Sequence, residues 1–219
     1  MKKKRRIIFE RTDRLETLCD GVFAVVMTVL VFDLKVPKTE GPLVDEIWKL
    51  WPKFASYIIS FLLVGIYWIA HHNQFNYIRR MDRNFIWMNI LFLMLVSLIP
   101  FSASLIGEHP FEQTSIIVYA LNLISIGFVM RAYMHYATKE HRLVDSSLDP
   151  VLVDRIKKIV LIQPVAYMIA IAISFFNVRA SLFFFLMVPP VFIFPGIMEW
   201  LLPLIEPVLN KTANEKEND

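Results

Sequence analysis

Long runs of uncharged residues recur along this chain, and they restrict its fold more than any other feature. Each run has between 17 and 23 residues, close to the 20 or so that a helix needs to cross about 30 Å of hydrocarbon. A helix also satisfies its own backbone hydrogen bonds, as a lipid-embedded segment must. The pattern predicts an all-α integral membrane protein. The five runs are 54–70, 85–107, 114–130, 159–177 and 180–198.

The first apolar stretch of the chain is different, because acidic residues bound it on both sides. Only twelve uncharged residues separate Asp20 from Asp33, a helix of about 18 Å, which is too short to span. To cross, this helix must include residues 17–20, so Asp20 lies inside the membrane or at its inner edge. An acid there costs several kcal/mol unless it is paired, hydrated or neutral, which makes it a functional hypothesis. The alternative is an interfacial acid that reaches headgroup water.

With this stretch the chain has six predicted spans. We expect a single six-helix transmembrane domain over residues 1–210 and a short disordered cytoplasmic tail over 211–219. Hydrophobic residues make up 56% of the chain and charged residues only 20%, which excludes an ordinary soluble domain. If both termini are inside, 18 of the 23 Lys and Arg residues lie on the inner side. The positive-inside rule therefore predicts a multi-pass protein of the cell membrane with both termini cytoplasmic.

The first helix carries a stripe of apolar side chains on one face. Val25, Val29 and Phe32 follow a spacing of four and then three residues, and Thr28 lies beside them. Such a stripe can pack against neighbouring helices. It can also line a narrow, dry constriction in a symmetric pore, where hydrophobic rings gate by dewetting. Spacing alone leaves both interpretations open.

Polar side chains gather near the inner ends of the second and third spans. Trp68, His71 and His72 lie at the same predicted depth as Asp20, and Asn89 is a buried amide that needs partners. An imidazole that donates to Asp20 would stabilise its charge. The alternative is a pair of interfacial histidines that face headgroups.

Three segments together resemble a known family, the lysosomal potassium channels in their single-unit prokaryotic form. The opening motif of that family reads Arg, three residues, then Phe-Ser-Asp followed by Gly-Val-Phe-Ala. Leu18 and Cys19 replace the Phe and Ser of the motif, and residues 67–72 (YWIAHH) and 89–102 also look like the family. The resemblance covers the whole chain. The matching motif residues are Arg14, Asp20, Gly21, Val22, Phe23 and Ala24.

The resemblance implies a homotetramer of six-helix subunits in which the first helices line a central pore for monovalent cations. It implies no Gly-Tyr-Gly carbonyl filter, and the chain has none. The family's constricting layers map onto Val25, Val29 and Phe32, and its pore-adjacent threonine maps onto Thr28. Val25 is smaller and Phe32 bulkier than the usual residues there. The family's polar network behind the inner pore mouth maps onto Arg14, Asp20, Trp68, His71 and Asn89.

We therefore expect a potassium-permeable cation channel, embedded in the lipid bilayer, that conducts K⁺ passively through a hydrophobic constriction. No cofactor or structural metal and no nucleic-acid partner is expected. The alternative is a proton channel or proton-coupled transporter that uses Asp20 with His71 and His72. We expect no enzyme, because the chain lacks HxxxH, Gly-x-Ser-x-Gly and Glu-x-x-His patterns, and its single Cys19 rules out a thiolate zinc cluster. A purely structural membrane protein is the third possibility.

Overall fold

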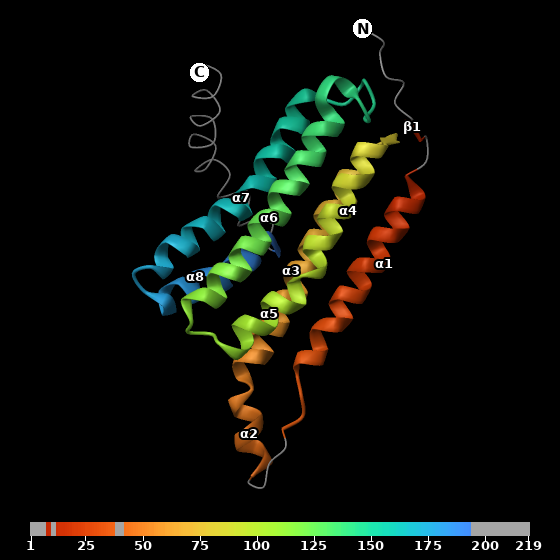
Figure 1. Ribbon diagram of the computed structural model, residues 1–219. Helices are drawn as coiled ribbons and strands as arrows, with labels where there is room; N and C mark the ends of the chain where they lie inside the picture. The colour runs from red at the N-terminus through yellow and green to blue at the C-terminus, as the bar shows by residue number, and fades with distance from the viewer. Residues whose placement is uncertain (1–7, 10–11, 38–41, 194–219) are drawn as a thin grey trace.

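The chain folds into a bundle of long helices, as the uncharged runs predict (Figure 1). The computed structural model describes residues 8–9, 12–37 and 42–193. The helices and short strands, in chain order, are β1 (Ile8–Phe9), α1 (Asp13–Val29), η1 (Leu30–Asp33), α2 (Leu43–Lys49), α3 (Trp51–Phe75), β2 (Met81–Asp82), α4 (Arg83–Ser97), α5 (Ile99–Glu108), α6 (Gln113–Thr138), η2 (Lys139–His141), α7 (Pro150–Ser174) and α8 (Val178–Ile193).

Five helical segments of the described chain are long and apolar enough to cross a membrane: Asp13–Asp33, Trp51–Phe75, Arg83–Glu108, Gln113–His141 and Pro150–Ser174. They confirm the first five predicted spans. The sixth run is present as the apolar helix α8, which is described as far as Ile193. The remainder of that run and the predicted tail over 211–219 lie outside the described residues.

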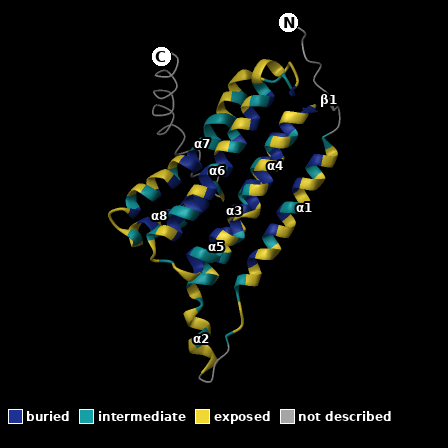
Figure 2. Cartoon of the chain, viewed as in Figure 1, coloured by how far each residue is buried: buried dark blue, intermediate teal, exposed yellow. Residues whose placement is uncertain are grey.

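The centre of the bundle is α6, and α1 lies at its edge (Figures 1 and 2). Half of the most apolar window of α6 is buried, against 28% of the window in α1. The contact of α6 with α7 is close, because a Cβ atom on Gly127 would lie only 2.4 Å from Cγ of Pro164. Glycine is therefore required at this crossing.

The third span is built from two helices. α4 ends at Ser97 and α5 begins at Ile99, with Pro100 in the first turn of α5. A proline in a first turn costs little, because its missing N–H has no partner there in any case. The break redirects α5, which packs against α3.

Three segments that are distant in sequence meet at one end of the bundle, which we call the basic end because it carries Arg79, Arg80 and Arg142. β1 pairs antiparallel with β2, and a bridge joins Ile78 to Val144 in the α6–α7 connection. Asp82 caps α4. It accepts hydrogen bonds from the backbone N–H of Phe85 (2.9 Å) and the hydroxyl of Tyr136 (2.6 Å). These contacts hold the N-terminal segment and two interhelical connections together.

Candidate functional site

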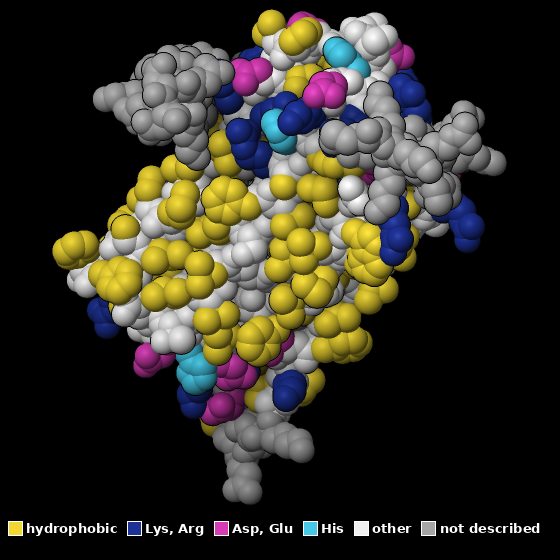
Figure 3. All heavy atoms as spheres, turned by 45° about the horizontal axis from the view of Figure 1, so that its top comes forward, with side chains coloured by type: hydrophobic (Ala, Val, Ile, Leu, Met, Phe, Trp, Pro, Cys, Tyr) yellow, Lys and Arg dark blue, Asp and Glu magenta, His cyan; other side chains and the backbone are white. Residues whose placement is uncertain are grey.

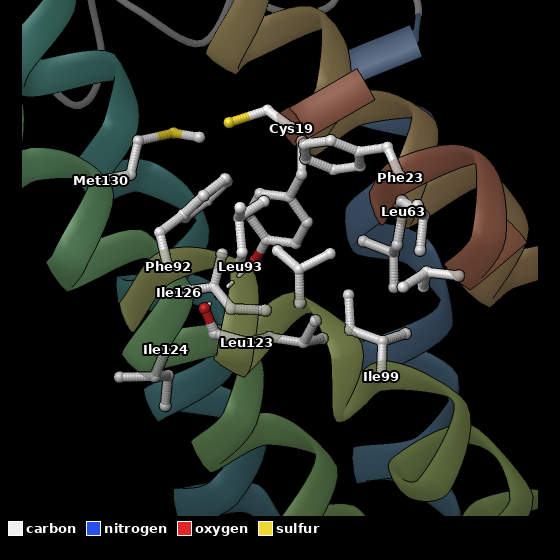
Figure 4. Close-up of a cluster of buried hydrophobic side chains, with 14 of the residues drawn as sticks. Cys19, Phe23, Leu63, Phe92, Leu93, Ile99, Leu123, Ile124, Ile126 and Met130 are labelled. Atoms are coloured by element: carbon white, nitrogen blue, oxygen red, sulfur yellow. Dashed lines mark hydrogen bonds between the residues drawn. The ribbon is translucent and has the colours of Figure 1, made fainter. Parts of the chain in front are cut away.

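The two sides of α1 and η1 differ sharply in burial. Leu15, Cys19, Phe23, Val26 and Leu30 are buried. Figure 4 shows Cys19 and Phe23 pointing into a cluster that includes Phe92 and Met130. This burial fixes α1 against the bundle through one side only.

The predicted stripe lies on the other side. Val25 is 59% exposed, Val29 37% and Phe32 75%. The stripe is therefore not part of the core of its own chain. This excludes the interpretation that the stripe packs against neighbouring helices of the same chain. A second chain, lipid or a water-filled pore can still lie against it.

Polar groups share the exposed side of α1. Thr28 is exposed, and its hydroxyl donates to the backbone oxygens of Val25 (2.8 Å) and Ala24 (3.1 Å). The proton is thus directed to the helix itself, so the oxygen can act only as an acceptor toward the outside. Asp20 is exposed as well. Because polar side chains within membrane spans face protein or water-filled space, this side of α1 is unsuited to contact with lipid tails alone.

Two hydrogen bonds to acidic side chains hold the ends of this segment against the bundle. The indole Nε1 of Trp68 on α3 donates to Oδ1 of Asp20 at 2.8 Å. The hydroxyl of Ser104 on α5 donates to Oδ1 of Asp33 at 2.7 Å. The sequence reasoning singled out Asp20 and missed the role of Asp33, although an acid at the end of an apolar run was the same signal. Together the two contacts set the rotation of α1 and so the direction of its exposed stripe.

His71 lies among aromatic rings, and its hydrogen-bond partner is Asn89. Its ring stacks between Phe75 (centroids 4.3 Å apart) and Phe92 (5.3 Å apart) and is buried. Its Nε2 lies 3.3 Å from Oδ1 of Asn89, whose Nδ2 donates to the backbone oxygen of Phe85 at 2.9 Å. In the described structure the donor to Asp20 is the Trp68 indole, while His71 pairs with Asn89.

The predicted network thus appears as two separate pairs, Asp20 with Trp68 and His71 with Asn89. His72 stacks on Trp68 at 5.7 Å between centroids. Arg14 is exposed and has no hydrogen bond or ion pair with any other described residue. Within the described ranges, no three His, Cys, Asp or Glu side chains are grouped so that they could hold a metal ion.

The Trp68–Asp20 contact allows a direct test of what holds α1. We expect Trp68→Phe to lower the free energy of unfolding by about 1 kcal/mol, because it removes a hydrogen bond to a charged acceptor and keeps an aromatic ring. Trp87→Phe is the matched control, since Trp87 is exposed on α4, and it should change stability by less than about 0.5 kcal/mol. Thermal unfolding in detergent measures both. Equal midpoint shifts in the two variants would show that the contact does not stabilise the fold.

Comparisons with known proteins show which family this chain is similar to. Residues 14–100 match the family model described as endosomal/lysosomal potassium channel TMEM175. A potassium channel of Chamaesiphon minutus is 35% identical over 178 residues, which cover 78% of this chain and 87% of that one. The crystal structure of a lysosomal potassium-selective channel TMEM175 homolog from the same organism superposes with a TM-score of 0.73, at 32% identity, over 83% of this chain and 95% of that chain.

A relative that matches less of the chain is named as a proton channel. The endosomal/lysosomal proton channel TMEM175 of Mus musculus is 35% identical over 113 residues, which cover 47% of this chain and 21% of the mouse protein.

Proposed function

This chain belongs to the TMEM175 family, and we propose that it is a multi-pass membrane channel that conducts K⁺ passively down its gradient. In this proposal four copies assemble so that their α1 helices surround a central axis. Val25, Val29 and Phe32 then form successive apolar rings. The observation that carries the proposal is the exposure of this stripe on a helix whose opposite side is buried.

The rings account for selectivity through the cost of removing water. An ion that passes a dry apolar ring sheds part of its hydration shell, and this costs less for K⁺ than for the smaller Na⁺. Thr28 lies one helical turn from Val25 and beside Val29, and its hydroxyl can offer only an acceptor to the outside. Its oxygen is therefore suited to replace a water molecule of the ion between rings.

Charge at the mouths supports cation conduction. Asp20 lies at the basic-end side of the stripe and Asp33 at the other side, and both carboxylates are held by hydrogen bonds. Negative charge near a narrow opening raises the local concentration of cations. Figure 3 shows Lys and Arg gathered with His at the end that comes forward, above a broad apolar belt. In this proposal the basic end faces the cytoplasm, as the positive-inside rule predicts, and both termini are cytoplasmic in a cell membrane.

Proton conduction is the alternative, since the relatives include endosomal/lysosomal proton channels. A relay through Asp20 and a histidine is disfavoured by geometry. His71 is buried against Phe75 and Phe92 and bonds Asn89, while Asp20 bonds Trp68. Among the described residues no hydrogen bond joins Asp20 to His71, so the relay lacks a continuous path. Channels catalyse no reaction, and we propose that this chain is not an enzyme.

Replacing Asp20 separates the two mechanisms. We expect Asp20→Asn to reduce potassium flux modestly, by about two- to fivefold, because it removes charge at the mouth but keeps an Oδ1 acceptor for Trp68. The ratio of potassium to sodium flux should stay as in the native protein, since the rings are unchanged. Flux from liposomes at several pH values measures this. Complete loss of flux in a folded Asp20→Asn protein, together with steep pH dependence in the native one, would favour the proton relay.

A further inference from the structure

Three basic side chains lie together where α6 and α7 pack at the basic end, and we call Arg131, His135 and Lys157 the α6–α7 cation cluster. Nη1 of Arg131 on α6 donates to the backbone oxygen of Lys157 on α7 at 2.7 Å. His135 follows Arg131 by one helical turn and is exposed. It lies within electrostatic range of both other members. The cluster therefore spans the seam between the two helices.

The cluster lacks a counter-charge from the described part of its own chain. No described carboxylate lies within ion-pair distance of any of its three members. Asp154 acts on Lys157 electrostatically, but it forms an ion pair with Lys158 at 2.8 Å. A guanidinium has five N–H groups, and Arg131 uses one of them for the bond to α7. Neighbouring positive charges repel each other, so an anion at the seam would stabilise the cluster.

The depth of the cluster in the membrane indicates which anion can reach it. On α6 the uncharged run 114–130 ends immediately before Arg131, and on α7 the uncharged run 159–177 begins two residues after Lys157. Because the two helices lie side by side with opposite directions, both limits fall at one depth (Figure 1). Figure 3 shows Lys, Arg and His side chains directly above the apolar belt. Phospholipid phosphates lie at this border between hydrocarbon and water.

An exposed apolar path leads from the cluster toward the middle of the membrane. Leu121 and Phe128 precede His135 by fourteen and seven residues, so the three side chains lie on one face of α6. Leu121 is 51% exposed and Phe128 46%. A hydrocarbon chain along these two side chains has its polar end at the cluster.

We propose that the α6–α7 cation cluster binds the phosphate of an anionic phospholipid, such as a phosphatidylglycerol, in the leaflet at the basic end. The remaining N–H groups of Arg131 and the ammonium of Lys157 donate to phosphate oxygens, and one acyl chain lies along Phe128 and Leu121. Charge-assisted hydrogen bonds to phosphate are strong, and basic sites between transmembrane helices suit anionic headgroups. A zwitterionic lipid fits less well, because its ammonium adds positive charge where a counter-charge is missing.

The test is a titration of dioleoylphosphatidylglycerol into the purified full chain, followed by native mass spectrometry. We expect one saturable site per chain and at least about fivefold weaker binding of dioleoylphosphatidylcholine, which has the same acyl chains. Lys157→Gln should weaken binding of the anionic lipid about three- to tenfold, because one cationic contact is lost. This variant should fold, since the Lys157 side chain has no hydrogen bond to another described residue and its backbone oxygen still accepts from Arg131.

Arg155→Gln is the matched control. Arg155 is exposed on α7 two residues before Lys157, so it lies on the opposite side of that helix. The variant removes one positive charge at the same end of the bundle, and its affinity should stay within about twofold of the native chain. Equal weakening in Lys157→Gln and Arg155→Gln would assign the binding to general surface charge and would overturn the site.

Three other results would also overturn the proposal. Absence of saturable binding to the native chain excludes the site, and equal affinity for the two lipids excludes recognition of an anionic headgroup. Inorganic phosphate that displaces the lipid at constant ionic strength and similar concentration would show that the cluster takes a free anion. A photoreactive residue in place of the exposed Ala132 should capture the added lipid. Capture of residues 194–219 or of a second copy instead would show that protein covers the cluster. Binding does not depend on the proposed conduction, so a channel without this site and a site without conduction are distinguishable.

Discussion

Val29→Lys should lower potassium flux at least about a hundredfold while the protein still folds. Val29 is part of the exposed stripe on α1, so in the proposed tetramer the substitution places four ammonium groups around one narrow ring. A like charge in a poorly hydrated passage opposes a permeating cation by several kcal/mol, and each 1.4 kcal/mol is a factor of about ten in rate. The measurement is potassium efflux from liposomes that contain the purified variant.

Val31→Lys is the matched control for this substitution. Val31 is also an exposed valine, two residues along, but in the helical repeat it falls on a different face from Val25 and Val29. The energetic cost of inserting a lysine is therefore similar at Val29 and Val31. Only the lysine at position 29 points toward the proposed pore. Flux close to that of the native protein is expected. Equal loss of flux in both variants would assign the effect to folding or assembly and would contradict the constriction.

Alanine substitutions at Phe23 and Phe32 should have different effects. The first should lower the stability of the protein, and the second should change ion conduction. Phe23 is 1% exposed and its ring lies 6.0 Å from both His71 and Phe92, measured between centroids. Phe23→Ala should lower the free energy of unfolding by about 3–5 kcal/mol, because it removes a large core side chain and leaves a cavity. Phe32→Ala should change it by less than about 0.5 kcal/mol, because Phe32 is 75% exposed.

The flux results should show the opposite order. Phe32→Ala widens the bulkiest of the proposed rings, so the ratio of potassium to sodium flux should fall while the protein keeps its stability. Unfolding in detergent and ion-specific flux from the same preparations measure the two effects. If Phe32→Ala left both conductance and ion ratio unchanged, Phe32 would not lie at a constriction.

Much of the fold could be predicted from the sequence, because a membrane-spanning helix needs an uncharged run of about 20 residues, and such a run is easily recognised. Four of the five uncharged runs, together with the first apolar stretch, coincide with the five spanning segments of the described chain, and helical spacing alone puts Val25, Val29 and Phe32 on one face. The short helix α2 and the pairing of β1 with β2 were not predicted. A seven-residue helix and two-residue strands are too short for any periodic signal.

The sequence shows which polar residues are candidates for function more readily than which side chains they bond. The sequence puts Trp68 and two histidines at the depth of Asp20 without choosing among them, and the structure pairs Asp20 with Trp68. Sequence spacing gives the face of a helix, but the neighbouring helix decides which side chain is within reach. The hydrogen bond from Ser104 to Asp33 joins residues 71 positions apart, so local spacing gives no sign of it.

Cation flux from liposomes that hold the native protein tests the central claim most directly. Potassium, sodium and proton flux are compared at the same driving force and at several pH values. We expect potassium flux to exceed sodium flux and to persist across pH. Proton flux without potassium flux would contradict passive potassium conduction and would indicate that protons pass by way of Asp20 and its neighbours. Absence of any flux in folded, reconstituted protein would contradict a channel open under these conditions.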